Sequence, residues 1–268
     1  IMIVTSFLAP GLYGGVEWTW YPHNYGRILG FADPMFEDFD PVYIAIFLRS
    51  LKIAALTVVA TLLVCYPAAF CISRLSDRWK NFCLFLITLP FFTSLIVRLF
   101  IWVLILRQTG LVNEVLIGTG VIARPLDLIY TDGAIVLGMV YVFIPFMFMP
   151  VYASVEKLDW TLVRASLDLG AGPVRTFLRI ILPLTAPGIA GGAVIVFIPA
   201  LGNFVVPAIL GGAKVMMLGN LIEQQFLAAR NWPFGSALAM MVMAVMLVLL
   251  FIYVVVSGRR GFDAAAGH

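Results

Sequence analysis

The sequence predicts an all-α integral membrane protein. Of its 268 residues, 62% are hydrophobic and only 12% are charged. Its mean hydropathy of +1.04 lies well outside the usual balance of a soluble domain. A spanning helix needs about 20 apolar residues, because the hydrocarbon core is about 30 Å thick and a helix rises about 1.5 Å per residue. Several segments reach this length, so the chain is expected to cross the membrane repeatedly.

Six spans are expected. Five full-length apolar segments lie at about residues 45–73, 82–106, 134–155, 185–210 and 234–257. The sixth is expected at 1–9, an apolar stretch that stops at Pro10 and Gly11 and that we interpret as the outer end of a helix whose beginning is missing from this chain. Together they predict a single transmembrane domain at 1–257, with a hairpin at 156–184 inside it and a tail at 258–268.

Basic residues in short loops predict the orientation, because Lys and Arg are retained on the cytoplasmic side. They gather in the connector after the second span, in the hairpin and in the tail: Arg74, Arg78, Lys80, Lys157, Arg164, Arg175, Arg179, Arg259 and Arg260. The first loop instead carries Glu17, Asp33, Glu37, Asp38 and Asp40, with Arg27 as its base. We therefore expect the hairpin and both termini to be cytoplasmic, and the first loop to face outward.

Charge and motifs argue against several classes of function. The net charge of +3 comes without any run of Lys or Arg with interleaved aromatic residues, so nucleic acid is not an expected partner. Cys65, Cys71 and Cys83 show no CxxC spacing and are expected to be packing residues. The sequence contains no HExxH, GxSxG or Walker A pattern. We expect no catalytic residue, no metal site and no enzyme activity in this chain.

The 156–184 hairpin is the most informative segment. Residues 161–169 favour a helix that ends at Gly170, because glycine most easily adopts the left-handed geometry of a helix end. Pro173 suits the first turn of a second helix, which Pro183 is expected to end before the next span. Two short helices meeting at a glycine form an elbow that fits a cleft on another protein. The alternative is an amphipathic hairpin lying on the lipid headgroups.

The hairpin resembles the cytoplasmic signature of type I ABC importer permeases, which reads EAA, then a glycine, then I-x-L-P. The matching residues are Arg164, Ala165, Ser166, Gly170, Ile180, Leu182 and Pro183. The resemblance implies a type I importer permease fold in which this hairpin, including Asp168 and Ala171, is the coupling helix that docks on an ATPase subunit. Arg164 departs from the pattern, because the family has an acid there. Either the ATPase partner carries a compensating acid, or Asp168 makes the negative contact.

Three further segments are similar to the spermidine/putrescine branch of these permeases, namely 89–102, 140–159 and 211–237. This resemblance implies import of polyamines by alternating access. Ala208 and Asn203 occupy a stretch where some polyamine permeases are acidic, so another small organic cation, an amino-acid derivative or an opine-like solute stays open. An ATP-independent channel and an intramembrane enzyme are the alternatives from other classes.

The same resemblance implies the partners and the location. It implies a second homologous permease subunit, two ATPase subunits that hold ATP and magnesium, an extracytoplasmic substrate-binding protein, and membrane lipid around a multi-pass chain in a bacterial inner membrane. No cofactor is expected on this chain itself. The segment 18–40, rich in Trp, Tyr and acids, is a candidate docking surface or a loop that covers the pore.

Polar and aromatic residues inside apolar segments are the candidates for a translocation pathway. Arg98 costs about 2.5 to 3.5 kcal/mol to insert, so it needs water or a partner, unless it snorkels to the headgroups. Asn203 needs a hydrogen-bond partner in the fifth span, and Glu223 is a carboxylate that could meet an amine, or a solvated loop charge. Trp102 and Tyr141 offer ring faces to an ammonium group, or form an interfacial belt.

Proline and glycine predict the shape of the spans. Kinks are expected in the fourth and fifth spans, at Pro145, Pro150, Pro199 and Pro207. Paired prolines in adjacent spans favour moving elements over static packing. Gly188 and Gly192 form a small-xxx-small pair, which predicts close packing against another helix.

Overall fold

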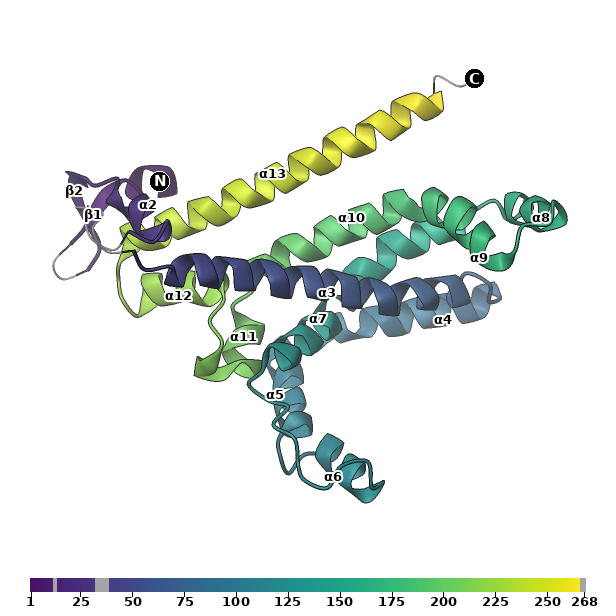
Figure 1. Ribbon diagram of the computed structural model, residues 1–268, viewed down its shortest axis with the longest axis horizontal. Helices are drawn as coiled ribbons and strands as arrows, with labels where there is room; N and C mark the ends of the chain where they lie inside the picture. Colours follow the sequence, from purple (N-terminus) through teal and green to yellow (C-terminus); the bar gives the residue numbers. More distant parts are fainter. Residues whose placement is uncertain (12–13, 32–38, 266–268) are drawn as a thin grey trace. The chain divides into compact units, whose positions relative to one another are not determined.

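A computed structural model describes residues 1–11, 14–31 and 39–265, and the described chain is mostly helical (Figure 1). The chain divides into two compact units. Unit 1 contains Ile1–Leu56, Leu95–Met139 and Ile198–Val248, and unit 2 contains Thr57–Ser94, Val140–Phe197 and Leu249–His268. Several long helices therefore have one end in each unit.

The prediction of a membrane-spanning helical protein is confirmed. Within the described residues, five helical stretches are long and apolar enough to cross a membrane: Val42–Ile72, Leu95–Gly118, Asp132–Glu156, Pro173–Leu201 and Trp232–Val255. The first, third and last of these begin and end within three residues of the predicted spans. The second and fourth differ because the backbone breaks inside or near the predicted segments.

Unit 1 contains the N-terminal elements, the middle of the chain and the segment before the last helix. Its elements are α1 (Met2–Thr5), β1 (Leu8–Pro10), β2 (Val16–Trp20), α2 (His23–Ile28), the start of α3 (Val42–Ile72), α5 (Leu95–Leu106), α6 (Leu111–Gly118), the start of α7 (Asp132–Glu156), the end of α10 (Leu182–Leu201), α11 (Val205–Leu210), η3 (Gly212–Lys214), α12 (Leu218–Leu227) and the start of α13 (Trp232–Ala265). The core of this unit includes Phe234 and Leu238 of α13 packed around Leu221 of α12.

The N-terminal segment differs from the single helix predicted at 1–9. α1 ends at Thr5, and the chain continues into an antiparallel pair, β1 and β2. The buried amide of Asn24 donates to the carbonyls of Ser6 and Leu8, both at 3.0 Å, and Phe7 stacks on Trp20 with ring centroids 5.0 Å apart. These long-range contacts hold Ser6, Phe7 and Leu8 in a non-helical form. The predicted acids Asp33, Glu37 and Asp38 lie outside the described residues.

Unit 2 contains the remainder of the long helices and the 156–184 hairpin. Its elements are the end of α3, α4 (Asp77–Thr88), η1 (Leu89–Phe92), the rest of α7, α8 (Trp160–Asp168), α9 (Pro173–Thr176), the π-helical turn η2 (Phe177–Ile181), most of α10 and the end of α13. The predicted tail at 258–268 is helical as far as Ala265, and the side chains of Arg259 and Arg260 lie outside the described set.

The predicted span at 82–106 is not one helix. α4 ends at Thr88, a 3₁₀ turn follows at Leu89–Phe92, and Thr93 is extended with φ −113° and ψ 148° before α5 begins. Pro90 explains the change, because proline removes a backbone donor that a continuous α-helix would use. The apolar span therefore begins at Leu95 and continues through α6.

The fifth predicted span, 185–210, also differs at both ends. Pro183 does not end a helix, because a π-helical turn at Phe177–Ile181 leads directly into α10. In an α-helix, the ring of Pro183 would crowd the carbonyl of the residue four positions earlier. The wider π-helical turn makes room for this ring. At the other end α10 stops at Leu201, and α11 restarts at Val205.

The predicted close packing at Gly188 and Gly192 is confirmed in unit 2. A Cβ atom on Gly188 would collide with Ser154 and with the carbonyl of Pro150, and one on Gly192 would lie 2.7 Å from the Met147 sulfur. Both glycines on α10 therefore face α7 closely, and at Gly188 the backbone carbonyl of Pro150 leaves no room for a larger residue.

Candidate functional site

The first arm of the 156–184 hairpin starts at a side-chain cap. Asp159 accepts hydrogen bonds from the backbone N–H of Thr161 at 2.9 Å and from its hydroxyl at 2.7 Å, so α8 begins at Trp160. These bonds, led by the one from the Thr161 side chain, favour the ionised form and hold the pKa of Asp159 below its ordinary value. The arm therefore has a defined start.

Gly170 forms the elbow at the end of this arm. Its φ of +82° is the left-handed conformation that favours glycine. The backbone N–H of Gly170 donates to the Leu167 carbonyl at 2.9 Å, and the N–H of Ala171 donates to the Ser166 carbonyl at 3.1 Å. These two hydrogen bonds are the Schellman pattern of helix ends. A Cβ on Gly170 would meet nothing within 4 Å. Backbone conformation, rather than crowding, therefore requires glycine here, and the elbow is open to a partner.

A second set of contacts fixes the angle between the two arms. Gly172 is extended, with φ −69° and ψ 159°, and Pro173 occupies the first turn of α9 as predicted. The hydroxyls of Ser166 on α8 and Thr176 on α9 lie 3.0 Å apart, and Thr176 is buried. The two arms are therefore joined both at the elbow and across it.

The base of the hairpin rests on an apolar cluster in unit 2. Leu158, Val163 and Ile181 are buried there, with Phe70, Trp160 and Phe177 packed against them. The guanidinium of Arg74, just beyond α3, lies 4.5 Å from the ring centroid of Phe70 and 4.8 Å from that of Trp160. We call Arg74, Phe70 and Trp160 the aromatic clamp. It connects the end of α3 to the first residue of α8.

The outer surface of the hairpin is exposed and mixed in character. Leu169 beside the elbow is 88% exposed and Val174 is 71% exposed. An open hollow of about 600 Å³ is lined by Gly172, Pro173, Val174, Arg175, Leu178 and Arg179. Apolar side chains next to two arginines suit a protein partner with apolar and acidic residues.

The remaining motif residues divide between this surface and the adjoining span. Ala165, Arg164 and Asp168 are exposed on α8, and no described ion pair uses the two charged ones. Ala171 is half-buried beside the elbow, as are Ile180 and Leu182 in and just after the π-helical turn, whereas Pro183 is exposed. The I-x-L-P element thus joins the hairpin to α10 without a helix end.

Four of the predicted pathway residues lie in unit 1. Arg98 and Trp102 are half-buried and one turn apart on α5, and Glu223 is half-buried on α12. The side-chain oxygen of Asn203 accepts the N–H of Val206 at 2.9 Å, so this amide satisfies the start of α11. Tyr141 lies on α7 in unit 2. A common pathway lined by all five residues stays a prediction.

All four predicted proline positions lie inside helices that the structure describes. Pro145 and Pro150 are inside α7, and Pro199 is near the end of α10. Pro207 is buried within the short helix α11. Kinking and movement at these prolines stay predictions.

The break at residues 202–204 was missed by sequence reasoning. The Asn220 amide donates to the Phe204 carbonyl at 2.9 Å. A Cβ on Gly219 would lie 2.5 Å from the carbonyl oxygen of Asn203. The start of α12 therefore packs closely on the interrupted backbone and satisfies one of its carbonyls. Adjacent Gly202 and Asn203 in an apolar run were the available signal, because both residues favour turns.

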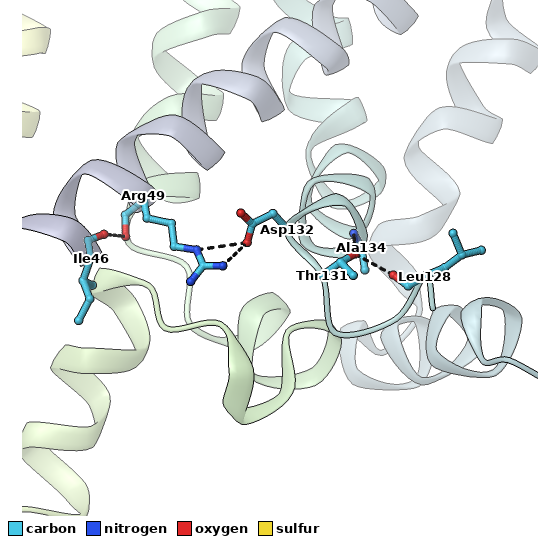
Figure 2. Close-up of polar contacts among 7 residues, drawn as sticks. Ile46, Arg49, Leu128, Thr131, Asp132 and Ala134 are labelled. Carbon is cyan, nitrogen blue, oxygen red and sulfur yellow. Dashed lines mark hydrogen bonds and ion pairs between the residues drawn. The ribbon is translucent and has the colours of Figure 1, made fainter. Parts of the chain in front are cut away.

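An ion pair between α3 and α7 was also missed (Figure 2). Arg49 Nη2 lies 2.6 Å and Nε 3.2 Å from Oδ1 of Asp132, the first residue of α7. Next to it, Ser50 Oγ donates to the Ile46 carbonyl and accepts the N–H of Leu218 at 2.9 Å, so α3 also holds the start of α12. We call Arg49, Ser50, Asp132 and Leu218 the α3–α7–α12 junction.

Comparison with known proteins agrees with this architecture. Residues 60–263 match the family model described as "binding-protein-dependent transport system inner membrane component". The chain is 39% identical over 253 residues to the spermidine/putrescine transport system permease protein PotB of Escherichia coli K12, covering 94% of this chain and 88% of that protein. It is 40% identical over 215 residues to PotB of Haemophilus influenzae, covering 80% and 75%.

A more distant relative and a solved structure extend the comparison. The inner membrane ABC transporter permease protein YdcU of E. coli K12 is 33% identical over 241 residues, covering 84% of this chain and 75% of that protein. A chain of a bacterial alginate ABC transporter, solved with an alginate pentasaccharide-bound periplasmic protein, superposes with a TM-score of 0.70 at 17% identity over 90% of this chain and 84% of that chain. That likeness shows the fold alone. By sequence match and by fold, the chain belongs to the family of binding-protein-dependent transport system inner membrane components.

Proposed function

We propose that this chain is a membrane-spanning permease subunit of an ATP-driven importer, and that it carries polyamines by alternating access. The observation that carries the proposal is the 39% identity over 253 residues to a spermidine/putrescine permease. Identity of this extent across 94% of the chain includes the spans as well as the hairpin. The substrate of the relative is therefore the best available indication of the substrate here.

The hairpin is the proposed coupling element. Two ATPase subunits, which hold ATP and magnesium, would dock on this hairpin and on that of a second homologous permease subunit. The exposed elbow at Gly170, the exposed Leu169 and the adjoining hollow supply a surface of the right character. A loaded substrate-binding protein would dock on the opposite, extracytoplasmic side. This chain contributes binding and movement, and the ATPase subunits contribute the chemistry.

The contacts at the base of the hairpin support a path for the movement. The aromatic clamp connects α8 to the end of α3, and the π-helical turn connects α9 directly to α10. A pull on the elbow would therefore reach two spans. Arg164 and Asp168 both remain exposed, so an acid on the ATPase could pair with the first, or a base with the second.

The orientation follows from the basic residues of the connectors. By the positive-inside rule, Arg74, Arg78 and the hairpin arginines support a hairpin in the cytoplasm of a bacterial cell. The start of α3 and the start of α7 then lie toward the extracytoplasmic side of the inner membrane.

One observation favours a second candidate substrate. Residues 182–210, which form α10 and α11, contain no carboxylate, whereas a tight polyamine site calls for several. Another small organic cation, an amino-acid derivative or an opine-like solute would cross this stretch as readily. Weak binding along the path is nevertheless compatible with polyamines, because conduction requires release.

Reconstitution tests the function. The permease pair, the ATPase subunits and the binding protein are placed in vesicles, and accumulation of labelled spermidine and putrescine is measured with and without ATP. The proposal predicts accumulation against a gradient only with ATP. Downhill equilibration without ATP would identify a channel, and ATP-driven uptake of a different solute alone would reassign the substrate.

A further inference from the structure

The carboxylate of Asp132 is only half used in its ion pair. Both nitrogen contacts from Arg49, at 2.6 and 3.2 Å, converge on Oδ1 (Figure 2). No hydrogen bond in the described part of the chain uses Oδ2. An ionised carboxylate has about four lone-pair sites, and a guanidinium most often pairs with it through two parallel bonds to both oxygens. This single-oxygen geometry leaves one side of the carboxylate available to another donor.

Asp132 is also not needed to start α7. The preceding residue, Thr131, accepts the N–H of Ala134 with its hydroxyl at 3.2 Å and donates to the Leu128 carbonyl at 2.8 Å. Figure 2 shows these contacts on the opposite side of Asp132 from Arg49. The helix start is therefore satisfied by Thr131, and the Asp132 carboxylate has only Arg49 as a described partner.

The pair is accessible to solvent. The side chains of Arg49 and Asp132 are 38% and 40% exposed. Ion pairs at such positions contribute little to stability and are screened by salt. Arg49 also sits beside Ser50, which holds the first residue of α12, the helix that carries Glu223. Residues 49 and 50 of α3 thus contact the first residue of α7 and the first residue of α12, respectively.

We propose that Asp132 binds an ammonium group of the solute on the extracytoplasmic side, and that Arg49 occupies the carboxylate when no solute is present. This inference rests on the proposed function, because it needs a cationic solute. An alkylammonium has three N–H donors and no acceptor, so it fits the unused Oδ2 and competes with Arg49 for Oδ1. Asp132 thereby becomes a specificity-determining residue at the start of the pathway, in a chain whose α10 and α11 offer no carboxylate.

The experiment compares removal of each partner separately. Asp132→Asn and Arg49→Gln are reconstituted with partner subunits and saturating loaded binding protein, and maximal uptake of spermidine and of putrescine is measured beside ATP hydrolysis. Loss of a charged hydrogen bond lowers uptake in Asp132→Asn by about tenfold. Uptake in Arg49→Gln does not fall, because the ammonium site is intact and the guanidinium that competes for it is gone. Glu114→Gln removes another exposed carboxylate of unit 1 and serves as the control.

The charge-reversed double variant separates this proposal from a purely structural ion pair. With Arg49→Asp and Asp132→Arg together, a structural pair is restored and uptake recovers, whereas an ammonium site is lost and uptake stays low. Equal loss in the two single variants followed by recovery in the double variant would overturn the proposal. A tenfold loss in Arg49→Gln would overturn it even if Asp132→Asn failed to fold. Failure of the wild-type complex to import polyamine would instead count against the proposed function itself.

Discussion

The hairpin of unit 2 and the α3–α7–α12 junction of unit 1 are built from different kinds of contact. In the hairpin, the two hydroxyls that join the arms are 10 positions apart, and the caps act within one or two turns. In the junction, Arg49 and Asp132 are 83 positions apart, and Ser50 and Leu218 are 168 apart. The hairpin therefore has a shape of its own to present to a partner, whereas the junction exists only when several helices are assembled.

The largest expected effect lies at the elbow, where Gly170→Val tests whether the hairpin depends on local backbone geometry. A β-branched residue at φ +82° costs about 1 to 2 kcal/mol or more, so the elbow opens and the docking surface is lost. We expect at least about a tenfold drop in the amount of ATPase subunit that copurifies.

Gly172→Ala is the matched control for the elbow. Gly172 lies two residues away, at φ −69° and ψ 159°, and a Cβ there meets nothing within 4 Å. We expect ATPase binding near the wild-type value. Equal loss in both variants would show that the hairpin surface, and not the turn, is the sensitive feature.

Packing within unit 2 comes next. Gly188→Ala places a methyl group against Ser154 and the Pro150 carbonyl, and overpacking of this kind costs about 1 to 3 kcal/mol. We expect a lower thermal midpoint for the purified protein. In Gly191→Ala, the atom nearest to the added methyl group is the hydroxyl of Tyr253 at 3.3 Å, so a much smaller decrease in the thermal midpoint is expected. A similar midpoint for the two variants would contradict the close α7–α10 contact.

The aromatic clamp should show a smaller effect, specific to coupling. Arg74→Met removes cation–π contacts worth about 0.5 to 1 kcal/mol at an exposed site. We expect fewer solute molecules imported per ATP hydrolysed, and recovery in Arg74→Lys. Arg78→Met removes a basic charge four positions further along and should leave this ratio unchanged. Equal effects of the two methionine variants would assign the result to surface charge.

The smallest effect concerns the cap of α8 and its pH dependence. Because hydrogen bonds lower the pKa of Asp159 in the folded state, the cap stabilises the protein at neutral pH. That contribution is present above the ordinary pKa of an aspartate and disappears as pH falls through the lowered folded pKa. The difference in thermal midpoint between wild type and Asp159→Ala should therefore shrink in acid. Asp159→Asn keeps a cap oxygen that does not titrate. The difference in thermal midpoint between Asp159→Asn and Asp159→Ala should therefore persist in acid. A difference between wild type and Asp159→Ala that is independent of pH would contradict the cap.

The sequence predicted features with local physical causes. Gly170 and Pro173 fix a helix end and a helix start with nearby atoms, and both lie where the pattern placed them. Apolar length predicted five stretches able to cross a membrane for the same reason, since it depends only on contiguous residues, but it did not predict the backbone breaks that shift the bounds of two of them.

The remaining features depend on contacts that a pattern does not contain. The N-terminal strands form because Asn24 and Trp20 hold Ser6, Leu8 and Phe7. The helix continues through Pro183 because a π-helical turn precedes this residue. The apolar sequence did not indicate that turn. The partners Arg49 and Asp132 were visible separately, but only the fold brings them together.

The role of the hairpin in coupling is tested most directly by ATP-driven spermidine uptake in vesicles, with complexes that carry Gly170→Val or Gly172→Ala. Uptake is measured with equal amounts of all subunits and with ATP hydrolysis recorded in the same sample. Coupling through the elbow at Gly170 predicts loss of uptake in Gly170→Val and wild-type uptake in Gly172→Ala. Wild-type uptake in Gly170→Val, with the ATPase subunits bound, would contradict the assignment of the hairpin as the coupling element.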